Sequence, residues 1–224
     1  MESVLFFDHD EQYRRIYEAG LQKTAMPDST FRRPRFYNLV QLFQATNHLA
    51  GNILEAGCFR GLSSYLLCSY ARQAEVSYDG KGFHIIDSFA GLSEPSQEDL
   101  EQVSGVHPRA EGRLYAASMS QVQEALSEFP EITYFKGWIP NVLGDLPDHQ
   151  YRFVHIDLDL YEPIHASLEY FFPKVVPGGF IVVDDYGYLD FPGAKKAVDE
   201  FCAANGISAV HLTTGNAVVM KSVA

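Results

Sequence analysis

Residues 53–61 read Ile53-Leu54-Glu55-Ala56-Gly57-Cys58-Phe59-Arg60-Gly61, a short apolar run that ends in an acidic residue and two glycines. The apolar pattern that follows, from Ser63 to Gln73, predicts a helix. A strand that passes through a glycine turn into a helix is the repeating unit of parallel α/β sheets. Gly57 permits a tight turn and a close approach of the backbone to a ligand. These residues therefore predict both a fold class and one ligand site.

Further apolar runs alternate with helical patterns on both sides of this unit. We expect strands at 53–54, 83–86, 132–135, 153–156 and 179–183, and an antiparallel pair at 210–212 and 217–220. We expect helices at 36–49, 63–73, 120–129, 164–172 and 194–205. The alternation predicts a mostly parallel sheet with helices on both faces. Residues 1–35 are expected to form a helical lid segment, and residues 36–224 one α/β domain.

The composition limits the kinds of molecule that we expect the protein to bind. The chain has 224 residues and a formal charge of −12, so its surface repels phosphate backbones and anionic lipid, and we expect neither nucleic acid nor membrane as a partner. The cysteines, Cys58, Cys68 and Cys202, are odd in number and lack CxxC spacing, which is typical of the reducing cytoplasm. No signal peptide and no apolar run of membrane-spanning length is visible.

The glycine turn differs from the GxGxxG pattern of dinucleotide folds, because Glu55 precedes Gly57. Glu55 would repel a pyrophosphate and attract an ammonium group, which favours a nucleotide that carries an amino acid. Gly61 and Ser63 stand where a helix begins, a place that suits a carboxylate. The alternative is that the glycines serve only the turn.

Two later strand ends are expected to complete this nucleotide site. Asp87 ends the second strand, where a carboxylate accepts hydrogen bonds from ribose hydroxyls; alternatively it caps a loop. Gly137 and Trp138 end the third strand, where an adenine ring stacks; alternatively Trp138 is buried in the core. The stretch 88–116 is long for a plain connection, which predicts a functional loop or lid.

Acidic residues follow the two strands nearest the C-terminus. Asp157 and Asp159 end the strand at 153–156, and Asp184 and Asp185 end the strand at 179–183. If these strands are neighbours, Asp157, Asp184 and Asp185 meet at one edge, where a hard divalent cation compensates their charge. Asp159 then remains free as a general base. The alternative is that these aspartates only cap helices and strand ends, and His155, in mid-strand, is expected to be a packing residue.

These motifs, in this order, resemble the macrocin O-methyltransferase family. The resemblance rests on Glu55 to Gly61, on Ile86-Asp87-Ser88-Phe89-Ala90-Gly91-Leu92, on Phe135-Lys136-Gly137-Trp138, and on the two aspartate pairs. It implies a Rossmann-like seven-stranded class I methyltransferase sheet, with the order 3-2-1-4-5-7-6 and the last strand antiparallel. It also implies S-adenosylmethionine as donor, Mg²⁺ (or Mn²⁺) as metal, a homo-oligomer, and a sugar hydroxyl on a natural product as acceptor.

The resemblance assigns roles to the residues already singled out. Asp157, Asp184 and Asp185 hold the metal, and Asp159 is the base. Donor contacts are expected from Glu55, Gly57, Gly61, Ser63, Asp87, Ser88, Gly137 and Trp138.

Three other functions stay open at this stage. The first is a methyltransferase that acts on a phenol or catechol. The second is a metal-dependent glycosyltransferase, since Asp157-Leu158-Asp159 is also a DxD motif. The third is a non-catalytic binding protein that has kept the fold.

Overall fold

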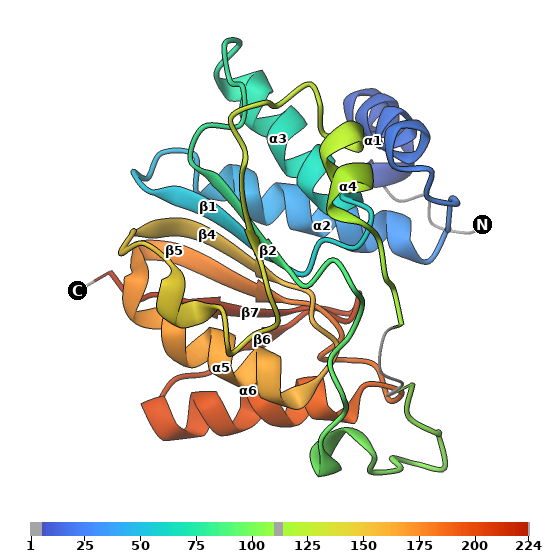
Figure 1. Cartoon of the computed structure of the whole chain (residues 1–224), viewed down its shortest axis with the longest axis vertical. Helices are drawn as coiled ribbons and strands as arrows, with labels where there is room; N and C mark the ends of the chain where they lie inside the picture. Colours follow the sequence, from blue (N-terminus) through green and yellow to red (C-terminus); the bar gives the residue numbers. More distant parts are fainter. Residues whose placement is uncertain (1–5, 110–113, 224) are drawn as a thin grey trace.

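A seven-stranded sheet forms the centre of the computed structural model, which describes residues 6–109 and 114–223 (Figure 1). Its order is β3-β2-β1-β4-β5-β7-β6, which confirms the expected class I methyltransferase arrangement. Strands β1 to β5 pair in parallel, and β7 runs antiparallel to both β5 and β6. The strands are β1 (Asn52–Ala56), β2 (Phe83–Asp87), β3 (Thr133–Lys136), β4 (Tyr151–Ile156), β5 (Val175–Val183), β6 (Val210–His211) and β7 (Ala217–Met220).

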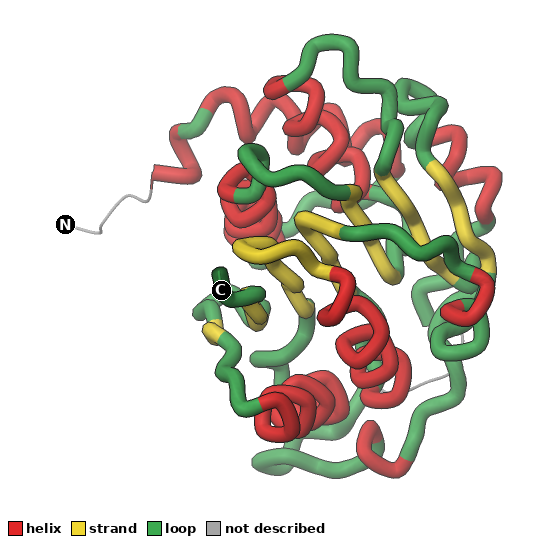
Figure 2. The backbone as a smooth tube through the Cα atoms, turned by 90° about the vertical axis from the view of Figure 1, so that its left-hand side faces the viewer, coloured by secondary structure: helices red, strands yellow, loops and turns green. Residues whose placement is uncertain are grey.

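Helices cover both faces of the sheet, as Figure 2 shows in profile. They are α1 (Glu11–Thr24), α2 (Arg32–Ala45), α3 (Leu62–Ala74), α4 (Met119–Ala125), α5 (Tyr161–Phe171) and α6 (Pro192–Asn205). Short 3₁₀ turns are η1 (Phe6–His9), η2 (Gln97–Asp99), η3 (Leu143–Asp145) and η4 (Phe172–Lys174). Successive strand residues point to opposite faces, so Ile53 packs with α1 to α4 and Leu54 packs with α5 and α6.

Helix α2 begins four residues before the expected start at 36 and ends at Ala45. Its first turn contains Arg32, Arg33 and Pro34, whose polar and proline character hides the helix from an apolar pattern. Proline is tolerated there because the first backbone N–H groups of a helix have no partner within the helix. Helix α4 is shorter than expected and begins with a capping box formed by Ser118 and Gln121.

The N-terminal segment is part of the main core. Tyr13 and Tyr17 of α1 are buried in the same apolar cluster as Phe36 and Leu39 of α2, and both helices contact α3. The expected boundary between residues 35 and 36 lies inside α2, so the structure does not separate lid and domain there. Among the described residues, no helix combines the length and the apolar character needed to cross a bilayer.

Candidate functional site

A cavity of about 550 Å³ lies at the carboxyl ends of β1, β2, β4 and β5, where parallel sheets bind their ligands. Its volume is in the range of small-molecule sites. Its wall contains nine of the residues singled out from the sequence: Gly57, Ser63, Asp87, Ser88, Gly137, Trp138, Asp157, Asp159 and Asp185. The long loop after β2 also contributes, through Gly91, Arg109 and Tyr115.

The turn after β1 requires glycine for a steric reason. Gly57 has a φ of +84°, and a Cβ at this position would lie 1.9 Å from the backbone oxygen of Asp157. Gly61 has a φ of +85° and is the residue just before α3. Gly57 therefore lets the first turn of the site lie directly against the end of β4.

Glu55 faces away from the cavity and is fully buried. One carboxylate oxygen accepts a hydrogen bond from Ser64 Oγ, and the other lies 2.8 Å from His155 Nδ1. Its carboxylate thus connects α3 to β4, whereas Ser63, the neighbour of Ser64, lies on the cavity wall. This placement leaves Glu55 no direct path to an ammonium group in the cavity.

Asp87, at the end of β2, holds the glycine turn in place. One oxygen accepts hydrogen bonds from the backbone N–H groups of Cys58 (2.8 Å) and Phe59 (3.3 Å). The other accepts from the N–H of Phe89 at 2.7 Å. Asp87 also lines the cavity, so it lies where a ligand would bind.

Trp138 lies on the cavity wall with 42% of its surface exposed, so the alternative of a core tryptophan is wrong. Its indole Nε1 donates to the carbonyl of Gly91 at 3.2 Å, which ties the end of β3 to the loop after β2. In the same loop, the Ser88 hydroxyl also donates to the Gly91 carbonyl, at 2.7 Å. A partly exposed indole on the cavity wall is available to pack against a ring of a ligand.

Four aspartates form an acidic cluster at the ends of β4 and β5, and three of them, Asp157, Asp159 and Asp185, line the cavity. Carboxylate oxygens of Asp157, Asp159 and Asp185 lie within 4.8 Å of one another. Asp159 and Asp185 adopt left-handed backbone conformations, with φ of +61° and +64°. Non-glycine residues in this region are uncommon and tend to be found at functional sites.

The electrostatics of the acidic cluster fit a hard cation. Burial and the neighbouring carboxylates raise the pKa of Asp157 and of Asp185 well above the usual range. Burial and Asp157 raise the pKa of Asp159 to about 7. Carboxylates forced together in this way favour a divalent cation with oxygen ligands, such as Mg²⁺ or Mn²⁺.

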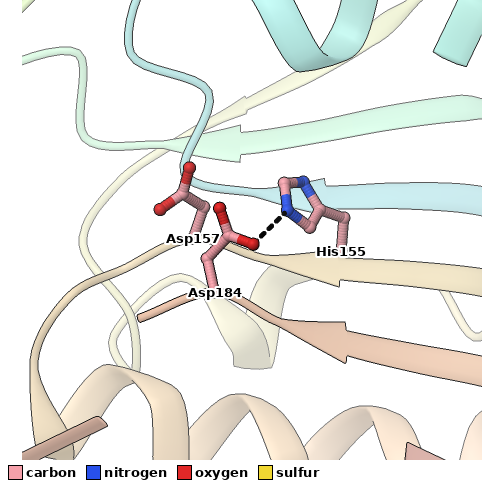
Figure 3. Close-up of side chains that lie close together, drawn as sticks. All are labelled: His155, Asp157 and Asp184. Carbon is pink, nitrogen blue, oxygen red and sulfur yellow. Dashed lines mark ion pairs between the residues drawn. The ribbon is translucent and has the colours of Figure 1, made fainter. Parts of the chain in front are cut away.

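Asp184 is the most enclosed member of the cluster, and it is absent from the cavity wall. Figure 3 shows it between Asp157 and His155, with His155 Nε2 3.4 Å from Asp184 Oδ1. Asn216 donates to the same oxygen. Burial works against the charged form, but Arg35 and His155 together lower the pKa of Asp184. Ligand atoms of His155, Asp157 and Asp184 also lie within 4.8 Å of one another.

Two site residues were not identified from the sequence. His155 is buried, as expected, but it connects Glu55 to Asp184 rather than serving only to pack. Arg35 reaches the acidic cluster from α2, 3.4 Å from both Asp184 and Asp185. The register of β1 against β4 pairs Glu55 with His155, so knowledge of that register would have identified the role of His155. No local sequence pattern indicates that Arg35 reaches the acidic cluster.

Several known O-methyltransferases are similar to this chain in sequence. The chain is 26% identical over 166 residues to mycinamicin III 3''-O-methyltransferase of Micromonospora griseorubida, which is 70% of this chain and 63% of that protein. It is 27% identical over 163 residues to demethyldecarbamoylnovobiocin O-methyltransferase of Streptomyces niveus, which is 70% of this chain and 60% of that protein. The chain thus spans less than two thirds of the length of either relative.

The structure of the O-methyltransferase NovP superimposes with a TM-score of 0.70 at 24% identity, over 84% of this chain and 80% of that one. At this identity the likeness supports the fold. The sequence model of the macrocin-O-methyltransferase family matches residues 12–219, nearly the whole chain. The chain therefore belongs to the macrocin O-methyltransferase family.

Proposed function

We propose that this protein transfers the methyl group of S-adenosylmethionine to a hydroxyl group of a small molecule, with Mg²⁺ or Mn²⁺ at the acidic cluster. One observation carries the proposal: the glycine turn and Asp87 line the same cavity as Asp157, Asp159 and Asp185. Methyl transfer needs this proximity, because the methyl group passes directly from sulfur to oxygen.

The donor is proposed to lie across the ends of β1 to β3. Its amino-acid end faces Gly57 and Ser63, its ribose meets Asp87 and Ser88, and its adenine lies on Gly137 and Trp138. The buried Glu55 supports this arrangement indirectly, by joining Ser64 to His155. Gly61 supports it by setting the start of α3.

The chemistry is proposed to occur at the acidic cluster. Asp157, Asp184 and Asp185 would hold a divalent cation, which would supply Lewis acidity toward the acceptor hydroxyl. Asp159 accepts the proton of that hydroxyl. The oxygen–methyl bond forms as the sulfur–methyl bond breaks, and the neutral thioether S-adenosylhomocysteine leaves.

The acceptor is proposed to be a sugar hydroxyl on a natural product, because the two relatives above are named for O-methylation of mycinamicin III and demethyldecarbamoylnovobiocin, and a third is named for a rhamnosyl tetracenomycin. A phenol or catechol is the alternative acceptor. The relatives transfer methyl groups, which favours methyl over glycosyl transfer. A methyl-transfer screen over glycosylated natural products and catechols separates the two acceptor classes.

We further propose that the protein is cytoplasmic and forms a homo-oligomer. Light scattering tests the oligomeric state.

The metal role is tested with Asp157→Asn. We expect turnover to fall by about 100-fold or more, because the carboxylate acts on the acceptor side. The affinity for S-adenosylhomocysteine, measured by calorimetry, should stay within about threefold, and EDTA should abolish wild-type turnover until Mg²⁺ is added. Asp148→Asn, which changes an exposed aspartate, is the control. Full activity in EDTA would remove the metal from the proposal, and collapsed donor affinity in a folded Asp157→Asn variant would refute the separation of the two half-sites.

A further inference from the structure

Arg35 brings a positive charge into the acidic cluster from a distant part of the chain. Its Nη1 lies 3.4 Å from Asp184 Oδ2 and 3.4 Å from Asp185 Oδ1, and these are two of the three proposed metal ligands. Only 13% of the side chain is exposed. The guanidinium therefore occupies space beside the same carboxylates that a divalent cation would use.

The contact is incomplete as an ion pair. Both Nη1 distances are longer than those of a good charge-assisted hydrogen bond. Arg35 Nε is buried and has no hydrogen-bond partner among the described residues. An arginine held for structure alone would be expected to form the two parallel hydrogen bonds that its planar group allows. At these distances the positive charge of Arg35 offsets the negative charge of the cluster, and the carboxylate oxygens can still accept other partners.

The contact between Arg35 and the acidic cluster matters because it changes the net charge of a buried site. Asp157, Asp159, Asp184 and Asp185 lie together in a largely buried site, where unbalanced negative charge is costly. A cation held by Asp184 and Asp185 would share carboxylates whose oxygens already lie 3.4 Å from the guanidinium. Two positive charges that share the same carboxylates repel strongly in a poorly solvated site.

We propose that Arg35 is a resident counter-cation of the metal site, which balances Asp184 and Asp185 in the metal-free protein and opposes the entry of a divalent cation. Arg35 is thus a positioning residue that sets metal affinity. The inference rests on the proposed metal role of the acidic cluster. Because Arg35 lies on α2, which also lines the cavity through Arg32 and Phe36, metal affinity is linked to the position of that helix.

The test measures Mn²⁺ binding by electron paramagnetic resonance of the free ion, with chelator-treated full-length protein saturated with S-adenosylhomocysteine. Arg35→Gln should bind Mn²⁺ at least about tenfold more tightly than wild type, because a repelling charge is removed. In EDTA the same variant should melt about 5 to 10 °C lower than wild type, because the buried carboxylates lose their counter-charge. Saturating Mn²⁺ should close that gap.

Two further variants separate charge from shape. Arg35→Lys keeps the charge, so its Mn²⁺ affinity should stay within about threefold of wild type. If Arg35→Gln does not fold, Arg35→Met, which removes the charge and keeps a long side chain, supplies the same comparison with Arg35→Lys at one pH. Arg14→Gln is the control for loss of a positive charge, because Arg14 is exposed, pairs with Glu18 and lies outside the cavity wall.

Unchanged or weaker Mn²⁺ binding by Arg35→Gln would overturn the counter-cation role. Equal changes in Arg35→Gln and Arg35→Lys would overturn it too, since shape and not charge would then be responsible. If wild type itself binds no Mn²⁺ or Mg²⁺, the metal part of the proposed function fails, and this inference fails with it. Binding by wild type with no response to Arg35 rejects this inference alone.

Discussion

Gly57 offers a sharp test of how the site is built, through the variant Gly57→Ala. Its φ of +84° costs an alanine about 1–2 kcal/mol. The added Cβ would also lie 1.9 Å from the Asp157 oxygen, so the turn and the end of β4 must move apart by about 1 Å. We therefore expect a loss well beyond the cost of the backbone angle alone.

The size of that extra loss follows from the hydrogen bonds around the turn. The N–H of Asp157 donates to Ala56 O, and the N–H of Gly57 donates to Ile86 O, both at 2.8 Å. Moving the turn away from β4 stretches the first bond and displaces Gly57 relative to Ile86 of β2, so both bonds, each worth about 1 kcal/mol, weaken. The total loss is about 3–4 kcal/mol, a large part of the roughly 5–15 kcal/mol that stabilises a domain.

Urea denaturation of Gly57→Ala measures this loss as a change in the free energy of unfolding, with the m-value checked for constancy. Gly206→Ala is the control, because Gly206 has a φ of +64° and nothing within 4 Å of an added Cβ. It should lose only the angle cost of about 1–2 kcal/mol. Equal losses in the two variants, within about 0.5 kcal/mol, would refute the steric reasoning.

Three further predictions address the site. Trp138 is the only tryptophan of the chain and lines the cavity, so S-adenosylhomocysteine should change the intrinsic fluorescence; a flat titration, with binding confirmed by calorimetry, would contradict adenine stacking there. Asp159→Asn should lower kcat by about 10²- to 10⁴-fold and leave donor affinity within about threefold, and an unchanged kcat would remove Asp159 as the base. In EDTA, the melting temperature should fall as the pH rises from about 5 to 8, and saturating Mg²⁺ should weaken the trend. The reason is that burial raises the pKa of Asp157 and Asp185, and raises that of Asp159 to about 7. The native state then keeps protons that the unfolded chain has already released near pH 4, so the free energy of unfolding decreases with rising pH. A melting temperature that rises across this range would show that the cluster is not protonated as inferred.

Much of the fold was predictable because its signals are local. The short apolar runs identified the five parallel strands and the closing antiparallel pair, and the glycine turn marked the start of the sheet's ligand edge. The beginning of α2 was missed, because the polar and proline residues of its first turn lie outside the apolar pattern. The predicted range for α4 was too long at its C-terminal end, because apolar residues continue beyond the last turn of the helix.

The residues of the candidate site also fall into two groups, those that local sequence signals predict and those that depend on distant contacts. Residues that end strands, such as Asp87, Asp157 and Asp185, were correctly expected at one edge, because parallel strands bring their carboxyl ends together. The direction of Glu55 was not predictable, since its partner His155 lies 100 residues away and meets it only through the register of β1 with β4. Arg35 is 150 residues from Asp185.

The order of apolar and polar residues along the chain thus determined the strands, most of the helices and the types of residue at their ends. Tertiary structure alone decided that Glu55 turns inward to His155, that Asp184 is enclosed by Asn216 and that Arg35 reaches the acidic cluster. Secondary structure follows from interactions between residues a few positions apart. The charge balance of a buried site depends instead on which distant side chains packing brings within a few ångströms of one another.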